Sequence, residues 1–62
     1  MAADELQTLV HDLRTPLTLV EGFSDLLLRR GDELPAPERD EYVQRIAAAA
    51  REMRELLDAI RR

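Results

Sequence analysis

Residues 6–27 read LQTLVHDLRTPLTLVEGFSDLL, and their apolar positions recur at alternating steps of four and three. This spacing is typical of the seam of a coiled coil or a four-helix bundle. The seam positions are Leu6, Val10, Leu13, Leu17, Val20 and Leu27, with Ser24 filling the gap between the last two. A second row, Leu9, Pro16 and Phe23, lies beside the seam and makes the apolar face wider than a two-stranded coiled coil needs. The pattern predicts a helix of about residues 4–30 that packs in a bundle.

A second helix is expected after a short loop. Gly31 directly follows two arginines, which is typical of a helix C-terminus because glycine ends helices and positive charge complements the helix dipole. Pro37 is followed by acidic residues, which is typical of a helix start. The loop is therefore placed at residues 31–36 and the second helix at about residues 37–62. Its seam again steps by three and four, through Val43, Ile46, Ala50, Met53, Leu57 and Ile60.

The composition supports one small all-α domain over residues 1–62. The chain has no cysteine, which excludes a disulfide framework and a zinc finger, and no metal site is predicted. Aromatic residues make up only 3%, so the core must consist of aliphatic side chains that favour packed helices. An antiparallel hairpin of two helices leaves a long apolar stripe exposed. We therefore expect the hairpin to homodimerise into a four-helix bundle.

Charge and hydropathy narrow the range of partners. The net charge is -4 and the acidic and basic residues alternate, so no basic patch is available for nucleic acid. No apolar run approaches the roughly 20 residues that span a bilayer, and no membrane contact is expected. All nine basic residues are arginines, so the chain has no lysine for Schiff-base or P-loop chemistry.

The single histidine, His11, is predicted to lie on the outer side of the first helix, because Val10 and Leu13 occupy the seam. Pro16 follows within the same helix. It lacks the N–H that would bond the carbonyl of Asp12, and an interior proline costs about 3 kcal/mol. We predict a kink at Pro16 that loosens the turn beside His11.

The helix face that carries His11 is a candidate partner surface. Gly22 lies on this face, and a glycine there costs about 1 kcal/mol relative to alanine, which suggests that a partner packs closely against it. Two leucines off the seam give the face an apolar edge. The predicted partner-binding residues are Arg14, Thr18, Leu19, Gly22 and Leu26.

The run VHDLRTPL at residues 10–17 resembles the H-box of the dimerisation and histidine-phosphotransfer domain of sensor histidine kinases. The runs YVQRI at 42–46 and MRELLD at 53–58 continue the resemblance, which covers nearly the whole chain. It implies that His11 accepts the γ-phosphoryl group of ATP and passes it to an aspartate on the receiver domain of a response regulator. This is the phosphorelay of two-component signal transduction, and it implies a cytoplasmic location within a parent kinase that can be membrane-anchored.

The same resemblance assigns roles to neighbouring residues. Asp12 would be the general base that orients the imidazole, and Thr15 would position water for a phosphatase reaction on the regulator. The chain contains no asparagine and no glycine-rich loop, so it lacks the family's nucleotide-binding box. The fragment is therefore expected to bind no cofactor, with ATP and Mg²⁺ held by a separate catalytic domain. The expected partners are a second copy, that ATP-binding domain and the receiver domain.

A second hypothesis assigns no chemical reaction to the chain. A dimeric helical hairpin that serves only as a scaffold or signal connector explains both seams equally well. It does not explain an exposed histidine and aspartate followed by a proline.

Overall fold

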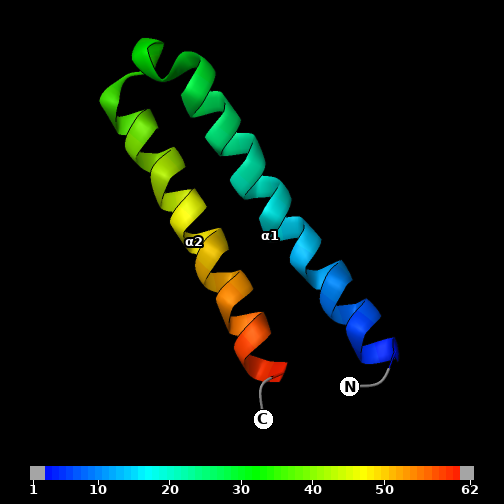
Figure 1. The fold of residues 1–62 in the computed structure, drawn as a ribbon. Coiled ribbons are helices and arrows are strands. Elements are labelled where there is room, and N and C mark those ends of the chain that lie inside the picture. The colour runs from blue at the N-terminus through cyan, green and yellow to red at the C-terminus, as the bar shows by residue number, and fades with distance from the viewer. Residues whose placement is uncertain (1–2, 61–62) are drawn as a thin grey trace.

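The computed structural model describes residues 3–60, which form a hairpin of two long antiparallel helices (Figure 1). Helix α1 spans Ala3–Arg30, the 3-10 turn η1 spans Gly31–Glu33, and helix α2 spans Ala36–Ile60. The hairpin is elongated, about 46 by 17 by 11 Å, and the start of α1 and the end of α2 lie at the same end of it, opposite the turn η1. The expected all-α hairpin is confirmed. Each helix begins one residue earlier than the sequence indicated, and residues 61–62 of the expected second helix lie outside the described residues.

The charged residues at the two ends of α1 stabilise this helix. Asp4 and Glu5 lie in its first turn, and Arg29 and Arg30 lie in its last turn. Acidic groups stabilise the positive end of a helix dipole and basic groups its negative end. Among the described residues, neither helix has the length and apolarity needed to cross a membrane.

The connection between the helices differs from the expected glycine cap. Gly31 has no positive φ, so it does not adopt the left-handed conformation that ends many helices. It instead opens the turn η1, which closes when the N–H of Leu34 donates to the Gly31 carbonyl at 3.3 Å. The carbonyl of Pro35 then accepts the N–H groups of Glu38 and Arg39 at 3.0 and 3.1 Å and starts α2. The missing N–H of Pro37 costs nothing in this first turn.

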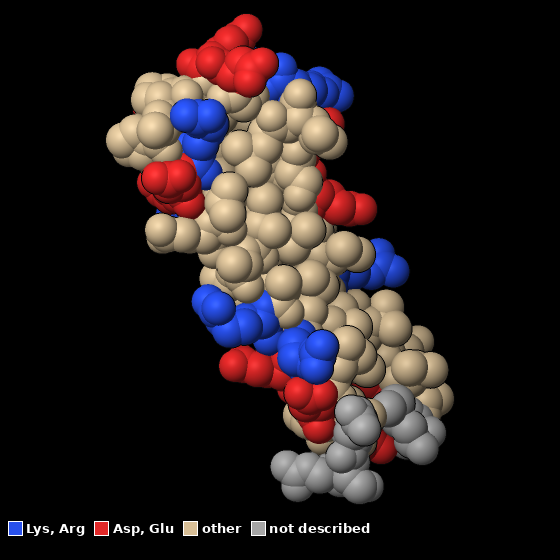
Figure 2. Space-filling view, turned by 60° about the vertical axis from the view of Figure 1, so that its left-hand side comes forward, with Lys and Arg blue, Asp and Glu red and all other residues tan. Residues whose placement is uncertain are grey.

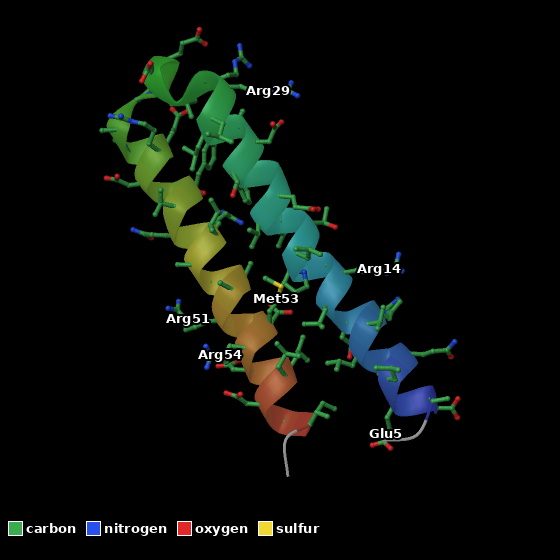
Figure 3. The ribbon with its side chains drawn as sticks, viewed as in Figure 1. Glu5, Arg14, Arg29, Arg51, Met53 and Arg54 are labelled. Carbon is green, nitrogen blue, oxygen red and sulfur yellow. The ribbon has the colours of Figure 1, made fainter. Side chains whose placement is uncertain are left out.

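The contact between the helices is centred on the second apolar row of α1. Pro16 is the largest fully buried side chain, and Ala49 on α2 is 4% exposed. The rings of Phe23 and Tyr42 stack across the helices with centroids 5.1 Å apart. Figure 3 shows Met53 directed from α2 toward α1. The half-buried apolar residues are Leu9, Leu13, Val20, Phe23, Leu26, Leu27, Leu34, Tyr42, Ile46, Met53 and Leu56.

The predicted seams are therefore divided between two faces. Leu6, Val10 and Leu17 of α1 remain 44–52% exposed, and Val43 and Leu57 of α2 remain 54% and 46% exposed. Most of these residues directly follow a residue that faces the other helix. One residue further along an α-helix is a rotation of about 100°, and in two antiparallel helices this rotation turns both side chains toward the same side of the pair. These five seam residues are exposed in the single hairpin, as expected for the apolar stripe that two helices alone leave uncovered. We call these five residues the separate apolar face. Figure 2 shows an uncharged expanse over the middle of the hairpin, with charged groups above and below it.

Candidate functional site

His11 lies in the first half of α1, on the exposed surface of the helix. Its side chain is 85% exposed, so the imidazole is in contact with solvent and takes no part in the packing of the hairpin. Exposure alone leaves both ring nitrogens available to a reactant.

Asp12 is the nearest charged group to the imidazole. Its Oδ1 lies 3.4 Å from Nδ1 of His11, and its side chain is 47% exposed. This is a long contact at the limit of a hydrogen bond, and it joins adjacent helical residues whose side chains normally diverge. When Nδ1 carries the proton it donates to Asp12, and the lone pair of Nε2 is then free to act as a nucleophile.

A hollow of about 380 Å³ lies between the two helices on one side of His11. His11, Asp12 and Thr15 line it from α1, and Glu52 and Leu56 line it from α2. The structure thus brings together the three residues to which the sequence assigned chemistry. It adds Glu52, which the sequence analysis missed because its place depends on how the two helices are aligned.

The hollow on the other side of His11 differs in the charge of its lining. A hollow of about 580 Å³ is lined there by His11 and Arg14 with three residues of the first turns of α1, Leu6, Gln7 and Val10. Figure 3 shows Arg14 directed away from α2. The imidazole therefore lies between a side with a guanidinium and a side with two carboxylates.

The predicted partner-binding residues are only partly on one open surface. Thr18 is exposed and shares a hollow with Arg14, and Leu19 is 45% exposed. Leu26 is half-buried. A Cβ placed on Gly22 would meet nothing within 4 Å, so the packing of this hairpin does not require a glycine there.

Pro16 lies one turn beyond the site. Helix α1 continues through it as one element, and its ring is buried against α2. The proline thus lies between the site at His11 and the packed contact of the two helices. Within residues 3–60 no group of three or more His, Cys, Asp or Glu side chains could hold a metal ion.

The whole chain, residues 1–62, matches the family model of the His Kinase A (phospho-acceptor) domain. No curated protein and no solved structure gives a significant match. Domains of this family are the phosphoacceptor and dimerisation modules of histidine kinases, which are transferases of two-component signalling. The helical hairpin and the exposed histidine agree with that assignment. The chain therefore belongs to the His Kinase A (phospho-acceptor) domain family.

Proposed function

We propose that His11 is the phosphoacceptor of this domain. It takes the γ-phosphoryl group of ATP from a catalytic domain and passes it to an aspartate on the receiver domain of a response regulator. The observation that carries the proposal is the 85% exposed imidazole whose Nδ1 lies 3.4 Å from the Asp12 carboxylate, within a chain of this family.

The contact between Asp12 and Nδ1 supports Nε2 as the atom that attacks in the first step. Nε2 attacks the γ-phosphorus, the Nε2–P bond forms, and the bond to the ADP oxygen breaks. Phosphorylation makes the ring cationic, and Asp12 then accepts or holds the proton on Nδ1. In the second step the Nε2–P bond breaks and the phosphoryl group moves to the aspartate of the regulator.

Thr15 is proposed to assist a phosphatase reaction, in which phosphate is removed from the regulator. It lies one helical turn after His11 and lines the same hollow. From there its hydroxyl can hold a water molecule against the phospho-aspartate of a docked receiver domain.

The nucleotide is proposed to be held elsewhere. Gly22 lies inside α1 and Gly31 in the turn η1, so neither forms a phosphate-binding loop, and the sequence contains no asparagine. These residues do not fit ATP with Mg²⁺, and a separate catalytic domain must supply both.

The exposed apolar face is proposed to be the dimer interface. Leu6, Val10, Leu17, Val43 and Leu57 would be covered when two hairpins face one another as a four-helix bundle. The exposed residues Arg14, Thr18, Leu19 and Gly22 are proposed to stay available to the receiver and catalytic domains, while Leu26 is half-buried.

Phosphorylation by the native catalytic domain tests the proposal. The chain is incubated with that domain and ATP, and an acid-labile phosphate is located by mass spectrometry, with His11→Gln as the matched variant. Phosphate on His11 that the substitution abolishes is the expected result. No label with the native domain attached would instead support the alternative function, a dimeric scaffold or connector.

A further inference from the structure

The two hollows beside His11 differ in charge. Asp12 and Glu52 are the charged residues that line the hollow on the α2 side together with His11, and no arginine lines it. Arg14 is the charged residue that lines the other hollow. A phosphoryl group on His11 would therefore have a favourable neighbour on one side and unfavourable neighbours on the other.

Glu52 and Asp12 belong to different helices. Glu52 comes from α2, outside the sequence run that carries the resemblance at His11, and it reaches the hollow across the interface with Leu56 beside it. Asp12 already contacts the imidazole at Nδ1. Among residues 3–60, Glu52 makes no hydrogen bond or ion pair with the imidazole, so it acts on the site through its charge. We infer that Glu52 destabilises the phosphorylated state of His11 and so speeds the departure of the phosphoryl group, an inference that rests on the proposed function.

The physical cause is repulsion between like charges. A phosphoryl group brings nearly two negative charges at neutral pH, and a carboxylate across the same open hollow raises the free energy of that state. When the Nε2–P bond breaks through a loose transition state, negative charge on the phosphoryl oxygens decreases and the repulsion is relieved. The group passes to water, giving inorganic phosphate and a proton, or to a carboxylate of the regulator.

Chemical phosphorylation allows a test on this chain alone. Phosphoramidate transfers its phosphoryl group to Nε2 of histidine and releases ammonia, so no catalytic domain is needed. The lifetime of the phosphohistidine is then followed by ³¹P NMR after removal of the reagent. His11→Gln identifies the signal, since this chain has one histidine.

Four variants at three positions separate the effect of charge from that of structure. Glu52→Gln is expected to lengthen the lifetime about two- to fivefold at low salt, and the effect should shrink as salt screens the repulsion. Glu52→Asp keeps the charge and should restore the wild-type lifetime. Glu55→Gln removes the same charge from an exposed residue of α2 that lines neither hollow, and it should change nothing. Arg14→Gln should act in the opposite direction and shorten the lifetime.

Equal lifetimes in the wild type and Glu52→Gln would overturn the inference. So would an equal lengthening in Glu55→Gln, because the effect would then come from net charge rather than from the hollow. The labelling is chemical, so these results do not depend on whether a catalytic domain phosphorylates His11. Failure of that enzymatic reaction would reject the proposed function while leaving the effect of Glu52 on the phosphohistidine measurable.

Discussion

The two halves of the hairpin are held together in different ways. Toward the turn, Phe23 and Tyr42 stack across the helices, and the ion pair of Arg45 with Glu41 lies on the surface at 3.2 Å. Toward the chain ends, open hollows flank His11 on both sides. The comparison indicates that close aromatic packing secures the half that has no proposed chemistry, while the half with the histidine stays accessible. Substitutions in each half can therefore be expected to separate stability from reactivity.

The largest effect is expected from Asp12→Asn, in the open half. Loss of the base should slow phosphorylation of His11 about a hundredfold, because a positioned general base contributes at least that much. Stability should hardly change, since Asp12 is exposed. The measurement is the initial rate of labelling from ATP with the native catalytic domain, beside thermal unfolding of the same variant. A rate within a few fold of the wild type would remove Asp12 from the mechanism.

Leu17→Glu tests whether a second chain completes the hairpin. Leu17 is 45% exposed on the separate apolar face, and a charge buried there on dimerisation has no partner. The dimer dissociation constant should rise about a hundredfold, close to 3 kcal/mol. Analytical ultracentrifugation measures it, with Gln44→Glu on another exposed face of α2 as the control. A wild-type chain that is monomeric at tens of micromolar would contradict the dimer altogether.

Phe23→Ala breaks the aromatic contact of the half near the turn. A cost of about 2–3 kcal/mol is expected, below that of a fully buried phenylalanine because Phe23 is only half-buried. Urea unfolding followed by circular dichroism measures it. Phe23→Leu keeps the apolar burial and should cost about 1 kcal/mol. No measurable cost for Phe23→Leu would show that the stacked ring contributes nothing beyond its apolar burial.

Pro16→Ala probes the boundary between the two halves. Restoring the backbone N–H relieves about 3 kcal/mol, while loss of the buried ring removes part of that gain. We expect helix α1 to straighten, with higher helicity and about 1–2 kcal/mol of added stability. Circular dichroism and thermal unfolding report both quantities. Unchanged helicity and stability would contradict the predicted kink.

The smallest effect is expected from Arg45→Ala. The pair with Glu41 has the favourable order for residues four apart, but both side chains are more than half exposed. Its loss should cost only about 0.3–0.5 kcal/mol. Urea unfolding at low and high salt checks this value. A cost near that of Phe23→Ala would mean that this ion pair stabilises the half near the turn as much as the aromatic ring does.

The helices could be predicted from sequence because their signals are local. Apolar spacing, the acidic start at Glu38 and the arginines before Gly31 act within a few residues of the ends they define. The division of the apolar residues into two faces could not be predicted in the same way. Val10 and Leu9 are neighbours on one helix, and only the angle at which α2 packs decides which of them is covered.

The same limit explains what was missed at the site. His11, Asp12 and Thr15 lie within one and a half turns of α1, so their shared surface follows from helix geometry. Glu52 is distant in sequence and reaches the hollow through the alignment of α2 against α1. The alignment depends on the turn η1 and on the contact between Phe23 and Tyr42, which no local pattern specifies.

The turn η1 also has a consequence for the order of folding. The contact between Phe23 and Tyr42 closes a much shorter loop of chain than the hollow that brings Asp12 near Leu56. Loop closure loses about 0.6 kcal/mol more entropy for each doubling of length, so contacts near the turn form at lower entropic cost. The hairpin should then close from the turn toward its free ends, and its reversible opening should begin at those ends. The histidine thus lies in the half of the hairpin that is expected to fold late and to open early.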